Sequence, residues 1–240
     1  MKRGLVVSFL ALLIALTVVS CGGASGTEGE TGTAGEAGDG GTQGSSGSSE
    51  SGGKQFPAGD FGYILNDTKD GIIITYYTGS SFDVVFPDTI EDYPVVGFLS
   101  FFSGNKKLTS VSLPDTITAI PNTAFYNCEA LAKVKLPASL VSIGNSAFNS
   151  TALTSVELPL ALTTIGSYAF GSCSSLKSIS LPETLTTVRE GGFYHCRNLS
   201  SFNVPAALTQ YGYNVFSDCH KLPLAVRDQL TAQGYSASQF

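Results

Sequence analysis

Four cysteines and both histidines of this 240-residue chain recur at intervals that would bring them into register. The cysteines are spaced by 45, 23 and 23 residues, and His195 and His220 each adjoin one of them. Thiols placed together can stay reduced, form a disulfide or, with imidazole, bind zinc. We expect buried thiols that pack as small apolar groups, with a disulfide between neighbours as the alternative. The four cysteines are Cys128, Cys173, Cys196 and Cys219.

A metal centre and an enzyme active site are not expected. The positions equivalent to the two histidines hold Asn, Ser, Asp, Glu and Arg elsewhere in the chain, as solvent-facing loops do. The sequence holds no G-x-S-x-G motif, no H-E-x-x-H motif and no phosphate-binding glycine loop. The net charge of −6 disfavours nucleic acid, which attracts a basic surface. We therefore predict a protein without catalytic residues or cofactors.

The elements that position these side chains come from a repeat of 23 residues. The skeleton L-x-x-V/I-x-L-P-x-x-L-x-x-I-G-x-x-A-F-x-x-C-x-x is complete at 153–175 and recurs on both sides. A period of this length is typical of a solenoid, in which each coil completes its apolar interior only against its neighbours. The opening leucines are Leu108, Leu131, Leu153, Leu176, Leu199 and Leu222, and the phenylalanines are Phe125, Phe148, Phe170, Phe193 and Phe216.

We predict a β-rich solenoid of parallel, stacked short strands, with five repeats at 105–221. The L-x-x-V-x-L segment alternates as a half-buried strand, and the proline after it ends the pairing because it has no N–H. The second repeat lacks the cysteine and is one residue short near Thr151, which should bend the stack slightly.

The flanking segments read as caps, at 55–104 and 222–240. Residues 61–65 and 71–77 predict a β-hairpin, and 82–87 imitate the first strand of a degenerate repeat. Phe101 and Phe102 compete for the phenylalanine position of that repeat. Residues 223–235 predict a closing helix that ends at Gly234. Such caps cover the open faces of the first and last coils.

The proline after the strand and the I-G-x-x-A-F-x-x-C segment resemble the BspA-like, or treponemal-type, class of leucine-rich repeat surface proteins. The resemblance is strong over 105–221 and weak over 60–104. It implies a leucine-rich repeat fold and a role in adhesion at the surface of a host-associated bacterium. Extracellular matrix proteins, epithelial cells or other bacteria are the partners that it implies.

Residues 1–20 predict a lipoprotein signal peptide. Lys2 and Arg3 precede an apolar run at 5–16 that is too short for a permanent span. The Val-Val-Ser-Cys sequence at 18–21 resembles a bacterial lipobox, which implies lipidation of Cys21 and anchoring in the membrane. Residues 21–54 are rich in Gly, Ser, Thr and Glu and predict a disordered linker. The expected location is the bacterial envelope, lipid-anchored at the outer membrane and exposed at the surface.

Outward positions of the predicted strands give the candidate partner-binding site. Sheet faces of leucine-rich repeats commonly bind proteins, and tyrosines at otherwise polar positions can add large contact areas at low entropic cost. The alternatives are a solvated polar face and a periplasm-facing scaffold lipoprotein of an envelope complex. The sheet-face candidates are Lys133, Lys135, Ser155, Glu157, Lys177, Ser178 and Ser180, and the aromatic candidates are Tyr126, Tyr168, Tyr194 and Tyr213.

Overall fold

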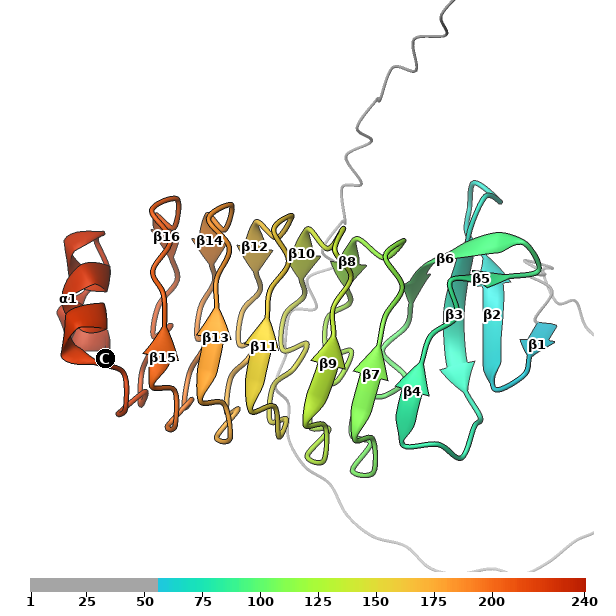
Figure 1. Ribbon diagram of the computed structural model, residues 1–240, viewed down its shortest axis with the longest axis horizontal. Helices are drawn as coiled ribbons and strands as arrows, with labels where there is room; N and C mark the ends of the chain where they lie inside the picture. Colours follow the sequence, from blue (N-terminus) through green and yellow to red (C-terminus); the bar gives the residue numbers. More distant parts are fainter. Residues whose placement is uncertain (1–55) are drawn as a thin grey trace, which may run out of the picture. The chain divides into compact units, whose positions relative to one another are not determined.

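The computed structural model of the protein describes residues 56–240. The predicted signal peptide, Cys21 and the whole of the predicted linker at 21–54 lie outside the described residues. Within 56–240, coils follow one another in sequence order from a β-sheet at the N-terminal end to a helix at the C-terminal end (Figure 1). The predicted β-rich solenoid with its two caps is therefore confirmed.

Each coil contributes two short strands, one on each side of the stack (Figure 1). Strands on one side come from the L-x-x-V-x-L segments and pair in parallel, so that Val111 lies beside Val134 and Val156 beside Ile179. This row contains β4 (Asp83–Val85), β7 (Ser110–Ser112), β9 (Lys133–Lys135), β11 (Ser155–Glu157), β13 (Ser178–Ser180) and β15 (Ser201–Phe202).

The strands on the other side come from the L-x-x-I segments and form one continuous parallel sheet in the order β16-β14-β12-β10-β8. Its register places Ile120, Ile143 and Ile165 side by side. The strands are β8 (Ala119–Ile120), β10 (Ser142–Ile143), β12 (Thr164–Ile165), β14 (Thr187–Val188) and β16 (Gln210–Tyr211).

The first row is divided where the short repeat lies. It forms two three-stranded sheets, β4-β7-β9 and β11-β13-β15, and within residues 56–240 no pairing joins β9 to β11. Thr151 is 4% exposed and takes the cysteine position; its hydroxyl donates to the Phe148 carbonyl at 2.9 Å. Only Ala152 separates Thr151 from the next opening leucine, where other repeats have two residues. The missing residue therefore interrupts one of the two strand ladders and leaves the other intact.

Stacked phenylalanine rings form the centre of the core. Neighbouring rings from Phe102 to Phe216 have centroids 5.3 to 5.9 Å apart and planes within 22° of parallel. Phe102 rather than Phe101 fills the first position, since Phe102 is 2% exposed and stacks on Phe125. Each coil is thus completed by a ring from the next, which is the reason that a single coil lacks a core of its own.

The four repeat cysteines are buried free thiols. Each Sγ donates to the carbonyl of the phenylalanine one coil earlier, at 3.0 to 3.1 Å, for example Cys196 to Phe170. Burial raises the pKa of Cys128 and of Cys173 to about 11. The thiols therefore serve as neutral hydrogen-bond donors inside the stack, which agrees with the favoured interpretation of the sequence.

The N-terminal cap is a five-stranded sheet in the order β1-β2-β3-β6-β5. The predicted hairpin is formed by β2 and β3, which pair antiparallel. The strand β6 pairs parallel with β3 and antiparallel with β5. The bounds are β1 (Phe56–Ala58), β2 (Phe61–Leu65), β3 (Ile72–Tyr77), β5 (Thr89–Ile90) and β6 (Tyr93–Phe98).

The C-terminal cap consists of α1 (Leu224–Ala232) and the short 3-10 helix η1 (Ala237–Gln239). Leu230 anchors α1 in the core, being 0% exposed. Backbone N–H groups that bond to the next coil elsewhere are bonded here by side chains. The Phe216 N–H donates to Tyr235 Oη at 3.1 Å and the Asn214 N–H donates to Gln239 Oε1 at 3.0 Å. The cap thus substitutes for the coil that would otherwise follow.

Candidate functional site

The sheet-face candidates lie on adjacent strands and point away from the core. On β9, β11 and β13 the middle residue faces inward and its two neighbours face outward. Lys177 precedes β13 and is exposed. The structure therefore places all seven predicted residues on one face, in three successive coils. These residues are Lys133, Lys135, Ser155, Glu157, Lys177, Ser178 and Ser180.

The division between β9 and β11 opens a cavity of about 370 Å³ in the middle of this face. Lys133 and Lys135 line one side, and Ser155 and Glu157 line the other. The floor contains Val134, which is half-buried, whereas the equivalent valines Val111 and Val156 are only 2% and 4% exposed. The missing residue therefore creates a cleft with charged walls and an apolar floor, which we call the central cleft.

The charge of this face changes along the stack. Lys133, Lys135 and Lys177 lie at its centre, with Glu157 between them. Towards the N-terminal cap, Asp83 accepts hydrogen bonds from Thr109 and Ser110 hydroxyls, both at 2.7 Å. These two hydrogen bonds lower the pKa of Asp83, and the more distant Lys133 lowers it further. The centre of the face is thus the part suited to a negatively charged partner.

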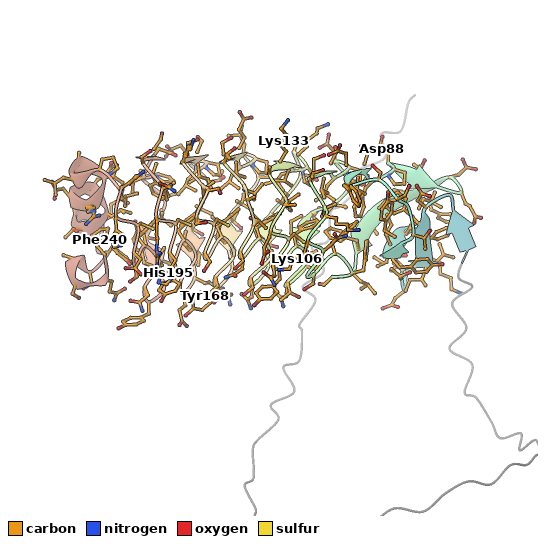
Figure 2. All side chains as sticks on the ribbon, turned by 90° about the horizontal axis from the view of Figure 1, so that it is seen from below. Asp88, Lys106, Lys133, Tyr168, His195 and Phe240 are labelled. Atoms are coloured by element: carbon orange, nitrogen blue, oxygen red, sulfur yellow. The ribbon has the colours of Figure 1, made fainter. Side chains whose placement is uncertain are left out.

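The tyrosine candidates lie apart from the sheet face, with Tyr168 on the side of the coils opposite Lys133 (Figure 2). Tyr168 and Tyr194 contact each other with perpendicular rings 6.0 Å apart, and Tyr194 stacks on His195 at 3.7 Å. The Tyr168 hydroxyl donates to Glu190 at 2.7 Å. These two tyrosines pack locally between coils. Tyr126 and Tyr213 are 42% and 63% exposed and have no ring contact with another aromatic residue of the described part of the chain.

The two histidines lie beside one carboxylate rather than beside the thiols. His195 Nε2 is 2.6 Å from Asp218 Oδ2, and His220 Nε2 is 3.6 Å from Asp218 Oδ1. Within residues 56–240 no group of three or more His, Cys, Asp or Glu side chains is arranged to hold a metal ion. In the same residues no helix has the length and apolar character needed to cross a membrane.

Two features of the face escaped the reasoning from sequence. The central cleft results from a one-residue deletion, and the only signal for it was the shortened spacing between Leu131 and Leu153. A second cavity, at the N-terminal end, is lined by residues of β2, β5 and the segment after β4. Tertiary packing of the cap forms that cavity, and the sequence carries no periodic signal for it.

Comparisons with known proteins agree with this architecture. Six copies of the BspA type leucine rich repeat region match residues 99–223. No curated protein sequence is significantly similar to this chain.

Solved structures with the same fold include a leucine rich repeat protein of T. pallidum, which is 34% identical, with a TM-score of 0.63 over 76% of this chain and 97% of that one. A leucine rich cell surface protein of Faecalibacterium prausnitzii is 30% identical, with a TM-score of 0.55 over 73% of this chain and 55% of that one. A pneumococcal vaccine antigen, at 19% identity and a TM-score of 0.53, shares the fold over 69% of this chain and 48% of that one. The repeat pattern, the stacked parallel strands and these similarities together show that this chain belongs to the BspA-type leucine-rich repeat proteins.

Proposed function

We propose that this protein is a lipid-anchored binding module at the bacterial cell surface that recognises a protein partner through the central cleft and the lysines around it. The observation that carries this proposal is the central cleft itself. A solvated face that serves only solubility needs no break in its strand ladder and no uncovered apolar floor. Membership in the family and the cell-surface relative support an interaction role at a bacterial surface.

The chemistry of the central cleft favours an acidic partner with an apolar contact residue. Lys133, Lys135 and Lys177 are exposed, so their ammonium groups are free to attract carboxylates from a distance. Val134 and Leu136 on the floor are half-buried and can gain further burial on contact. An apolar centre with a charged rim is the usual anatomy of a protein interface. We therefore expect host matrix proteins with acidic segments to be the partners.

The anchor is proposed from the sequence at 18–21, because Cys21 lies outside the described residues. A Cys21→Ala variant should lose incorporation of labelled fatty acid and appear in the medium or the soluble envelope fraction. Retention of the label in this variant would contradict lipidation at Cys21. With Cys21 lipidated, the predicted linker at 21–54 holds the repeat array away from the membrane.

Binding of the protein to immobilised matrix proteins tests the sheet face. The Lys133→Glu, Lys135→Glu and Lys177→Glu triple variant should lose binding at low ionic strength and keep the circular dichroism of the parent. The matched control inverts the same number of charges away from the strands, at Lys69, Arg197 and Lys221. Equal binding by the two variants, with intact folds, would remove the sheet face as the site.

The alternative is a periplasm-facing scaffold of an envelope complex. Surface display and periplasmic location differ in access, so brief protease treatment of intact cells separates them. Loss of the repeat array with retention of periplasmic marker proteins supports the surface module. Protection of the array until the outer membrane is opened supports the scaffold.

A further inference from the structure

The cavity at the N-terminal end of the sheet face lies outside the central cleft. It has a volume of about 470 Å³ and opens beside the end of β4. We call it the cap pocket. The residues that decide its chemistry are Asp60, Phe61, Val85, Phe86, Ile90 and Glu91.

The walls of the cap pocket are apolar and held in place by the core. Phe61, Phe86 and Ile90 are 9%, 3% and 4% exposed, and the centroids of the two phenylalanine rings are 5.4 Å apart. Val85 projects outward from β4 and is 69% exposed, so one wall remains available for contact. Because these side chains belong to the packed junction of cap and first coil, the pocket exists before any ligand binds.

The rim of the cap pocket is negatively charged. Asp60 and Glu91 are exposed carboxylates at its edge, and the lining includes no lysine or arginine. Glu91 and Asp92 form the two-residue turn between β5 and β6, with left-handed φ values of 50° and 67°. Asn-Gly is the usual choice for such a turn. Here the turn instead presents the Glu91 carboxylate to the pocket, at a cost in backbone conformation.

The nearby edge of β4 is unsuited to pairing with an added strand. Phe86 donates its N–H to Ser112, so Asp83 and Val85 direct their peptide groups to the free edge. The Ser81 hydroxyl accepts from the Asp83 N–H at 3.1 Å and donates to the Asp83 carbonyl at 2.7 Å. Only Val85 then keeps peptide groups directed outward, which is too little for a strand. The pocket therefore suits a single inserted side chain.

We propose that the cap pocket binds a cationic side chain, arginine above all, presented by a protein partner. The methylene stem contacts Phe61, Val85 and Ile90, and the guanidinium pairs with Asp60 and Glu91. Arginine fits better than lysine because its planar head can bond two carboxylate oxygens and stack on an aromatic ring.

Asp88 lies between two residues of the pocket lining, Pro87 and Thr89, and is on the same side of the coils as Lys133, towards the N-terminal cap (Figure 2). A partner that spans both sites carries its basic residue opposite the cap and its acidic residues opposite the central cleft.

Fluorescence anisotropy with the full chain tests this site. The probe is the labelled peptide Gly-Thr-Val-Arg-Val-Thr-Gly, and its twin carries citrulline, which keeps the shape of arginine without the charge. We expect the citrulline peptide to bind at least about tenfold more weakly. The Asp60→Asn/Glu91→Gln variant should lose the preference for arginine. The Asp228→Asn control, at the far end of the stack, should keep it.

Three outcomes would overturn the proposal: no binding of the arginine peptide at millimolar concentration, equal binding of the two peptides, or parent-like binding by the folded Asp60→Asn/Glu91→Gln variant. A fourth contrary outcome is that a second copy of this chain occupies the cap pocket. Sedimentation would then show association that the double variant abolishes. The lysine triple variant of the sheet face should bind the arginine peptide as the parent does, so the two sites stand or fall separately.

Discussion

The Tyr235 hydroxyl takes the place of a following coil at one backbone N–H of the last coil, and its removal is the sharpest test of the stacking argument. Tyr235 is 2% exposed, accepts the Phe216 N–H at 3.1 Å and donates to the Gln239 carbonyl at 3.1 Å. Tyr235→Phe keeps the ring and its contacts with Tyr211, Phe216 and Phe240. No cavity of ring size forms, so the change isolates the cost of the lost hydrogen bonds.

The Phe216 N–H is left buried without an acceptor, which costs about 1–3 kcal/mol. For a protein of this size, 1 kcal/mol lowers the midpoint of thermal unfolding by roughly 2–4 °C. Urea unfolding followed by circular dichroism measures the loss, and hydrogen exchange at the Phe216 amide locates it. The isosteric control is Tyr211→Phe. Tyr211 is half-buried, and its hydroxyl donates only to the Gln233 side chain, at 3.0 Å.

We expect the Tyr211→Phe variant to lose less than about 0.5 kcal/mol, because a partly solvated bond contributes little. Equal stability of the two variants, with parent-like protection of the Phe216 amide, would refute the reasoning. The side chains of the cap would then not replace a following coil.

Three further predictions concern the interior of the stack. Phe170→Ala should lower the free energy of unfolding by about 3–5 kcal/mol, since its ring is 0% exposed and stacks on rings 5.4 and 5.6 Å away; an unchanged urea midpoint would contradict this. Thr123→Asn should raise the melting temperature by relieving about 1 kcal/mol, because Thr123 has a left-handed φ of 55° that asparagine adopts more readily; a lower melting temperature would count against it. The free energy of unfolding should fall as pH rises from 9 towards 11. Burial in the folded state raises the pKa of Cys128 and Cys173 from 9.0 to about 11, so the folded state keeps protons that the unfolded state releases. Urea midpoints that stay constant over this range would disprove it.

The sequence predicted the repeat-based part of the fold because the repeat is a physical constraint as well as a pattern. Positions such as Phe125 and Phe148 recur with the coil, and only stacking in register buries them all. The outward face was predictable for the same reason, since alternation along a strand leaves Lys133 and Lys135 on the polar side.

Other features depend on contacts that no periodic signal encodes. Two positions in each repeat have left-handed backbone, yet residues as different as Thr123, Tyr168 and Asn214 occupy one of them. No shared residue type marks such a turn. The cap pocket likewise joins Phe61 to Glu91 through tertiary packing. The shortened spacing of the second repeat is visible in the sequence, but its effect, a split in one ladder and an opened floor, depends on how the strands pair on both sides of the stack.

The side chains of Tyr235 and Gln239 accept backbone N–H groups of the last coil, as the backbone of a following coil would. This arrangement affects how such proteins can diversify. Apart from the short second repeat, each internal coil offers its successor the same set of donors and acceptors, whereas both ends are sealed by dedicated segments. A duplication or loss of one whole internal unit therefore alters length by a single step of about 4.8 Å and leaves each terminus properly closed. The repeat array can therefore be lengthened or shortened in evolution without a new cap at either end.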